Sequence, residues 1–185
     1  MTILSRECDI FPEGLLSEDA PPETDRHWWT FYTRVRQEKS LARELLARQI
    51  PFYLPLVERF HLYKGCKRSS FVPLLTSYIF LFATEEERVK ALSTNRVAQI
   101  LPVPNPRELV RDLRPIQRLI AAKVSLTVES RLQPGQRIRV RDGALAGIEG
   151  VVYARSKRTK LVVLLHLLQQ GVAVEVDDFL LEPIS

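Results

Sequence analysis

The sequence has few of the residues that build disulfide-stapled, metal-binding or catalytic sites. Of its 185 residues only two are cysteine, three histidine and seven glycine. Cys8 and Cys66 predict neither a disulfide scaffold nor a metal site, and His27, His61 and His166 lack the spacing of metal ligands. No glycine-rich phosphate loop or nucleophile elbow occurs. We therefore expect no enzymatic activity, no metal and no cofactor.

Long apolar runs are also absent. The longest lies near Leu161–Leu168, far short of the roughly 20 residues that span a bilayer. The N-terminus lacks the basic, apolar and small-residue succession of a signal peptide. Since the hydrophobic content of 45% is normal for a folded soluble protein, we expect a cytoplasmic protein without membrane contact.

The charge is unevenly placed along the chain. Residues 1–25 contain one basic and seven acidic residues, residues 26–123 contain 18 basic and 8 acidic ones, and residues 124–185 are nearly balanced. A basic field over the middle of the chain favours a polyanionic partner, nucleic acid before membrane. The simpler alternative is that the charge only keeps the protein soluble.

The segment of residues 1–26 is rich in acidic residues and contains Pro21-Pro22. A segment of such a composition cannot close a hydrophobic core. We expect a disordered or loosely packed tail and assign no chemistry to it. Masking of the basic segment by this tail is an alternative to simple solvation.

Residues 27–123 alternate between strand and helix patterns. Trp28, Thr30 and Tyr32 alternate with Trp29 and Phe31, the period of a strand. Further patterns predict a helix over 36–49, a strand over 52–57 and a basic hairpin with its tip at Lys64-Gly65. A buried strand over 78–83 follows, and then a helix opened by a Thr84–Glu87 capping box. A strand over 97–101 and a helix from Asn105, which Pro115 should kink or split, complete the segment. This order predicts an α+β fold with helices against a sheet.

Residues 134–152 carry the most distinctive pattern. Two turn signals flank Ile138 and Val140, which alternate with arginines as in a half-buried strand. Gly147 and Gly150 then mark tight bends before a second strand. The pattern resembles the KOW motif of small five-stranded barrels; the alternative is an ordinary glycine-bent hairpin.

The landmarks of residues 27–123 resemble the NGN domain of the NusG family, most closely its RfaH-like specialised paralogues. Trp28-Trp29 matches the tryptophan–aromatic opening, and Glu38 matches a glutamate of the first helix region. The run Pro73–Phe80 matches the family at Tyr78 and Phe80 and departs from it over residues 75–77, as expected of a divergent member. The resemblance implies an NGN-type α/β sandwich over 27–123, a linker over 124–133 and a small KOW (SH3-like) β-barrel over 134–185.

The resemblance also implies a function in transcription. Family members travel on RNA polymerase, hold its clamp helices in an apolar, aromatic-rimmed pocket and suppress pausing or termination. The matching pocket positions are Tyr32, Leu74, Leu75, Tyr78 and Phe80. The tyrosines are favoured, because a tyrosine can bury its ring and keep its hydroxyl in water. RNA polymerase is therefore the expected partner of a monomeric chain.

The basic residues then have an expected place, on the side that in the family faces the upstream DNA and the non-template strand. They are Arg34, Arg36, Lys39 and Arg43, the last three aligned on one helix face, and Arg59, Lys64, Lys67 and Arg68 on the hairpin. Phosphate contact and reading of base sequence are both open roles for them.

The KOW resemblance implies a second partner, such as termination factor Rho or a small-subunit ribosomal protein. The loop Gly143–Gly150 would bind it through Leu145 and Ile148, unless both side chains point inward. Residues 161–170 fit a strand or a helix, so an RfaH-type change of fold is an open hypothesis. The alternative function is a ribosome- or RNA-binding KOW protein, which would not need the landmarks at Trp28, Tyr78 and Phe80.

Overall fold

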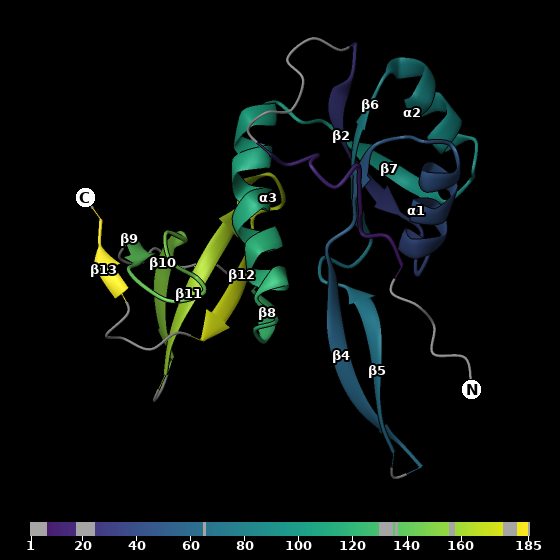
Figure 1. Ribbon diagram of the computed structural model, residues 1–185. Coiled ribbons are helices and arrows are strands. Elements are labelled where there is room, and N and C mark those ends of the chain that lie inside the picture. The colour runs from purple at the N-terminus through teal and green to yellow at the C-terminus, as the bar shows by residue number, and fades with distance from the viewer. Residues whose placement is uncertain are drawn as a thin grey trace. The chain divides into compact units, whose positions relative to one another are not determined.

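The computed structural model describes residues 7–17, 25–64, 66–129, 135, 137–155, 158–175 and 181–184 (Figure 1). The chain divides into two compact units, residues 1–106 and residues 107–185. This boundary differs from the expected one at residues 124–133, because the last long helix groups with the second unit.

The first unit is built on a five-stranded antiparallel sheet with the strand order β1-β3-β6-β2-β7. Strands β4 and β5 form a two-stranded sheet of their own, which projects away from the larger sheet in Figure 1. The elements are β1 (Ile10–Phe11), β2 (His27–Thr33), α1 (Glu38–Ala47), β3 (Phe52–Tyr53), β4 (Leu56–Tyr63), β5 (Cys66–Pro73), β6 (Tyr78–Ala83), α2 (Glu85–Leu92) and β7 (Val97–Leu101). The mixed α/β succession predicted for residues 27–101 is confirmed.

The hydrophobic core of this unit lies between the sheet and its two helices. Alternation along β2 and β6 places Phe31, Ile79 and Leu81 in one buried cluster with Leu41 and Leu45 of α1. Helices α1 and α2 lie on the same side of the sheet (Figure 1). Truncating one of these leucines to alanine should cost about 2–5 kcal/mol, so the core holds α1 and the two central strands together.

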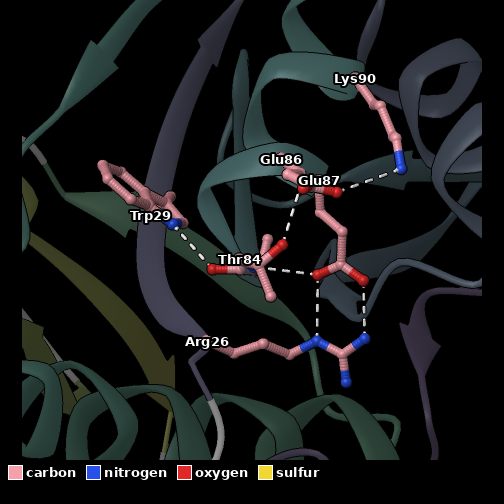
Figure 2. A network of polar contacts seen from close by, with 7 residues as sticks. Arg26, Trp29, Thr84, Glu86, Glu87 and Lys90 are labelled. Atoms are coloured by element: carbon pink, nitrogen blue, oxygen red, sulfur yellow. Dashed lines mark hydrogen bonds and ion pairs between the residues drawn. The ribbon is translucent and has the colours of Figure 1, made fainter.

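Helix α2 begins at the predicted capping box, which is confirmed (Figure 2). The Glu87 amide donates to Thr84 Oγ1 at 3.2 Å, and the Thr84 amide donates to the Glu87 carboxylate at 2.9 Å. Arg26 donates two hydrogen bonds to the same carboxylate at 3.0 and 2.6 Å. The bond from Arg26 is the main reason that the pKa of Glu87 is lowered. Trp29 Nε1 donates to the Ala83 carbonyl oxygen at 3.1 Å, so the capping box is linked to the start of β2.

The N-terminal segment packs against the sheet, and the expectation of a loose tail is wrong for residues 7–17. Strand β1 pairs with β3, and the Leu54 amide donates to the Asp9 carbonyl oxygen at 2.7 Å. Leu15 and Leu16 are buried. The segment is acidic on average. Its backbone nevertheless pairs with an available sheet edge, and its large apolar side chains are buried or half-buried. Residues 1–6 and 18–24 of the expected tail lie outside the described residues.

The second unit contains α3 (Pro106–Ala121) and a six-stranded antiparallel sheet with the strand order β13-β9-β10-β11-β12-β8. The elements are β8 (Leu126–Glu129), β9 (Arg137–Val140), β10 (Glu149–Arg155), β11 (Arg158–Leu165), the 3-10 helix η1 (His166–Leu168), β12 (Gln170–Glu175) and β13 (Leu181–Pro183). Within the described residues no pairing joins the edge strands β13 and β8, so the expected closed barrel is not shown. Strand β8 pairs with β12, which corrects the expectation of a linker at these residues.

Helix α3 is tied to the sheet of the second unit by a buried carboxylate. Asp112 is 5% exposed, and its Oδ2 atom lies 2.9 Å from both the amide nitrogen and Nδ1 of His166. Arg118 donates to the Ala146 carbonyl oxygen at 2.6 Å. The helix runs unbroken past Pro115, so the expected split does not occur; a proline removes one backbone donor, and packing of the helix can compensate for it.

Strands β10 and β11 approach so closely that one position admits only glycine. A Cβ atom at Gly150 would lie 2.5 Å from the Val162 carbonyl oxygen and 2.6 Å from Leu161 Cδ1. The segment 161–170, which fits a strand or a helix by sequence, is strand up to Leu165 and continues as η1.

Candidate functional site

The face of β2 and β6 opposite the two helices carries an aromatic row. The paired residues are Trp28 with Phe82, Thr30 with Phe80 and Tyr32 with Tyr78. Directly paired residues lie on the same face of a sheet. The ring centroids of Trp28 and Phe82 are 5.4 Å apart, and those of Tyr32 and Tyr78 are 5.2 Å apart. The pair of Trp28 with Phe82 was not selected from the sequence, although the same alternation could have indicated it.

Tyr32 and Tyr78 form the exposed end of this row. Tyr32 is 39% exposed and Tyr78 is half-buried. Their rings meet edge to face at 62°, an arrangement that contributes about 0.5–1.5 kcal/mol beyond area burial. Burial, and secondarily the neighbouring Tyr32, raises the pKa of Tyr78. The Tyr78 hydroxyl therefore stays protonated, and can donate a hydrogen bond, at neutral pH.

A buried carboxylate positions the residue before Tyr78. Glu38 is 5% exposed, and its Oε1 atom accepts a hydrogen bond from the Ser77 amide at 2.7 Å. The Ser77 carbonyl oxygen accepts from the Thr33 amide at 2.7 Å. Ser77 has a φ of 68°, a left-handed conformation that a non-glycine residue adopts only when its surroundings enforce it. Glu38, chosen from the sequence only as a family landmark, thus supports the turn that leads into β6.

The other three predicted pocket residues are buried. Leu74 is 5% exposed, Leu75 is 1% exposed and Phe80 has no exposed surface. These side chains cannot touch a partner in this conformation. They belong to the core that supports the two tyrosines.

Four of the predicted nucleic-acid-binding residues lie at or just before α1. Arg34 and Arg36 are exposed, but Arg36 precedes the helix with a φ of 58°. The expected alignment of three cations on one helix face is therefore wrong, since only Lys39 and Arg43 belong to α1. Both meet the Glu7 carboxylate, at 3.8 and 3.0 Å. The sequence analysis missed this contact, because residues so far apart in the chain form no local pattern.

The other four predicted nucleic-acid-binding residues lie on the β4–β5 hairpin. Arg59, Lys64 and Arg68 are exposed, and the side chain of Lys67 lies outside the described part of the structure. Over residues 56–73 the hairpin carries four basic residues and one acidic residue, Glu58. The hairpin is therefore a cationic arm of the first unit.

The sequence of residues 26–117 matches the family model described as "Transcription termination factor nusG". This part of the chain is similar to the NusG family. The matched residues include the aromatic row, α1 and the cationic hairpin, and they end inside α3. No curated protein sequence matches the chain significantly.

Two solved structures related to the NusG domain were compared with the whole chain. NusG of Thermotoga maritima, from a study of its domain interaction, has 18% sequence identity and a TM-score of 0.49, over 86% of this chain and 98% of that one. The MjSpt4:Spt5 complex has 14% identity and a TM-score of 0.28, over 86% of this chain and 97% of that one. Because both TM-scores are low, the similarity to the NusG family depends on the sequence match of residues 26–117.

The NusG match ends before the KOW-like stretch, where the two predicted partner-binding residues differ in exposure. Leu145 is half-buried, whereas Ile148 is 1% exposed. The Ile148 amide donates to the Leu145 carbonyl oxygen at 3.1 Å, and the Val140 amide donates to the Ile148 carbonyl oxygen at 2.9 Å. Ile148 thus holds the loop against β9, and only Leu145 is available at the surface.

The described residues contain no cluster of three or more His, Cys, Asp or Glu side chains that could bind a metal ion. In the same residues, no helix combines the length and the apolar character needed to cross a bilayer.

Proposed function

We propose that this protein is a transcription elongation or antitermination factor, an RfaH-like specialised member of the NusG family. Its first unit binds the clamp helices of RNA polymerase through Tyr32 and Tyr78 and suppresses pausing or termination. The supporting observation is the edge-to-face tyrosine pair at the exposed end of the aromatic row, within the residues that match the NusG family. Aromatic anchors of this kind dominate the energy of protein interfaces.

The basic residues of the first unit contact the upstream DNA or the non-template strand. Arg34 and Arg36 precede α1, and Arg59, Lys64, Lys67 and Arg68 belong to the hairpin. Lys39 and Arg43 join them only after they exchange the Glu7 carboxylate for phosphate. Such contacts position the protein without specifying sequence.

The second unit recruits a second partner, Rho or a small-subunit ribosomal protein. Leu145, at the surface of the loop Gly143–Gly150, makes the contact, and the buried Ile148 keeps the loop in shape. A small unit that presents a single apolar loop residue fits a regulated, reversible contact.

Replacing Tyr78 with alanine tests the polymerase contact. Tyr78→Ala should weaken binding of the full chain to core RNA polymerase by about tenfold or more, since a central interface aromatic contributes about 1–2 kcal/mol or more. Tyr78→Phe should retain most of the affinity, because it keeps the ring. Binding is measured by titration with purified polymerase, and function by pausing and termination assays in vitro.

The matched control is Val89→Ala, which truncates an exposed apolar side chain on α2. It should leave polymerase binding unchanged. Wild-type affinity in Tyr78→Ala would remove Tyr78 from the interface. Recovery of ribosomal RNA in place of polymerase would favour a ribosome- or RNA-binding protein.

A further inference from the structure

The second unit contains a groove between α3 and one face of its sheet. The volume of the groove is about 610 Å³, within the range of about 300–1,000 Å³ that small-molecule sites occupy. It is lined by α3, by the sheet and by η1, through Arg111, Pro115, Arg137, Val151, Leu164 and His166. All of these residues belong to the second unit, so the groove lies within one compact part of the chain.

The wall that the sheet contributes to the groove is partly apolar. Arg137 pairs with Val151, and Val151 pairs with Val162, so these three side chains lie on one face. Leu164 follows Val162 by two residues and lies on the same face. Val151 and Leu164 are half-buried, and they therefore offer an accessible apolar surface to the body of a ligand.

The two carboxylates at the groove accept hydrogen bonds from other side chains of the unit. Asp112 Oδ2 lies 2.9 Å from both the amide nitrogen and Nδ1 of His166. Glu149 accepts a hydrogen bond from Arg139 Nε at 3.0 Å. The negative charges that line the groove are therefore already engaged.

The two guanidinium groups at the groove meet these carboxylates only at long range. Arg111 Nε lies 3.7 Å from Asp112, and Arg137 Nη2 lies 3.9 Å from Glu149, distances too long for a hydrogen bond. Arg111 also donates to Glu108 at 3.2 Å, but a guanidinium has five N–H donors. The side chains of Arg111 and Arg137 are 68% and 66% exposed. Exposed ion pairs contribute little to stability, so both arginines can turn to a stronger anion.

The combination of two arginines with an apolar wall selects the kind of ligand. A guanidinium group binds phosphate through two parallel hydrogen bonds. A phosphate group carries a charge of about −1.5 to −2 and three acceptor oxygens, so it can accept from two arginines at once. Inorganic phosphate would leave the apolar wall uncovered, whereas an organic phosphate also covers the wall.

We propose that this groove is a binding site for a small organic phosphate. Arg111 and Arg137 bind the phosphate group, and the body of the ligand packs against Pro115 and Val151. The ligand links α3 to β9 and β10, and it stabilises the second unit because it binds only the folded form. The site goes beyond the proposed function, whose tyrosine pair belongs to the first unit.

Calorimetric titration of the full-length protein with three probes tests this site. The probes are phenyl phosphate, inorganic phosphate and benzoate. The wild type should bind phenyl phosphate at one site with a Kd below about 1 mM, and at least about tenfold more tightly than the other two probes. Inorganic phosphate bound as tightly as phenyl phosphate, or no saturable binding of phenyl phosphate, overturns the site. Benzoate bound as tightly assigns the groove to a carboxylate and overturns the phosphate.

Four alanine variants separate the groove from general charge attraction. Arg111→Ala and Arg137→Ala should each weaken binding of phenyl phosphate about tenfold or more, since each removes a charge-assisted hydrogen bond. The matched controls are Arg107→Ala on the same helix and Arg141→Ala directly after the same strand, both exposed and outside the groove. They should bind as the wild type does. Equal losses in the controls and in the groove variants would contradict a defined site.

A conservative variant and the thermal unfolding of the proteins complete the set. Arg137→Lys should bind with intermediate affinity, because lysine keeps the charge but loses the planar pair of donors. Since Arg111 and Arg137 are exposed, their alanine variants should unfold at the wild-type temperature without ligand. Phenyl phosphate should raise the melting temperature of the wild type more than that of either variant.

Hydrogen exchange locates the ligand and distinguishes this site from the proposed function. Phenyl phosphate should slow exchange in α3, β9 and β10 of the wild type and leave β2 and β6 unchanged. Protection of the β4–β5 hairpin in their place would overturn the groove as the site. Tyr78→Ala should keep the wild-type affinity for phenyl phosphate, and Arg137→Ala should keep the wild-type affinity for polymerase, so each proposal can fail without the other.

Discussion

Glu38 offers the sharpest test of how the first unit holds its tyrosine pair. Its carboxylate is buried and accepts a hydrogen bond of 2.7 Å from the amide of Ser77, the residue directly before Tyr78. Glu38→Ala removes this acceptor and leaves the Ser77 amide without its partner in a buried place. Glu38→Gln keeps a side-chain oxygen at the same reach and removes only the charge.

The size of the effect follows from two contributions. A hydrogen bond to a charged group contributes about 1.5–3 kcal/mol, and an unsatisfied buried donor costs a similar amount. A carboxylate in the first turn of a helix, where Glu38 lies, adds about 0.3–1 kcal/mol through the helix dipole. We expect Glu38→Ala to lower the free energy of unfolding by about 2–4 kcal/mol, and Glu38→Gln by about half as much.

Urea denaturation of the full chain, followed by tryptophan fluorescence, measures this change. With a urea dependence of about 1–3 kcal/mol per M, Glu38→Ala should lower the unfolding midpoint by roughly 1–2 M. Glu44→Ala is the control on the same helix, because Glu44 only makes surface ion pairs that contribute less than about 1 kcal/mol. Absorbance titration of the tyrosines adds a local readout, since loosening the turn should bring the raised pKa of Tyr78 back toward its ordinary value. Equal midpoints for Glu38→Ala and Glu44→Ala would refute the reasoning.

Three further changes test other parts of the chain. Gly150→Ala should increase hydrogen exchange in β10 and β11 and leave β2 and β6 unchanged, because its Cβ would meet a backbone carbonyl oxygen at 2.5 Å. Glu7→Gln should alter stability by less than about 1 kcal/mol yet raise oligonucleotide affinity at low salt, since two cations lose their partner; unchanged affinity would contradict this. The hydrogen bond from Arg26 lowers the pKa of Glu87. The stability that this bond contributes is therefore present above pH 4.5, the ordinary pKa of a glutamate, and is lost as the pH falls through the lowered pKa of Glu87. Arg26→Ala should therefore flatten the acid dependence of the melting temperature.

The polymerase-contact hypothesis could be formed from the sequence because the landmarks of residues 27–123 resemble the NGN domain of the NusG family, and local alternation adds the strand faces. The two-residue period of residues 27–33 and 78–83 already places Trp28, Thr30 and Tyr32 on one strand face and Tyr78 and Phe80 on another. The capping box at Thr84 joins residues only three apart, so its hydrogen bonds form wherever that stretch is helical. The burial of Leu75 and Ile148 could not be predicted in this way, since an apolar residue next to a turn has no period that assigns it to the surface or to the interior.

The sequence by itself determined the strands and helices of residues 27–101, the cationic character of residues 59–84, and the similarity of residues 26–117 to the NusG family. These properties are encoded within short windows of the chain. Only the tertiary structure decided that β1 docks on β3, that Glu38 supports Ser77, that Glu7 meets two cations of α1, and that Asp112 ties α3 to the sheet of the second unit. Each of these contacts joins residues tens of positions apart, and such a contact forms only when the whole packed unit brings its two ends together.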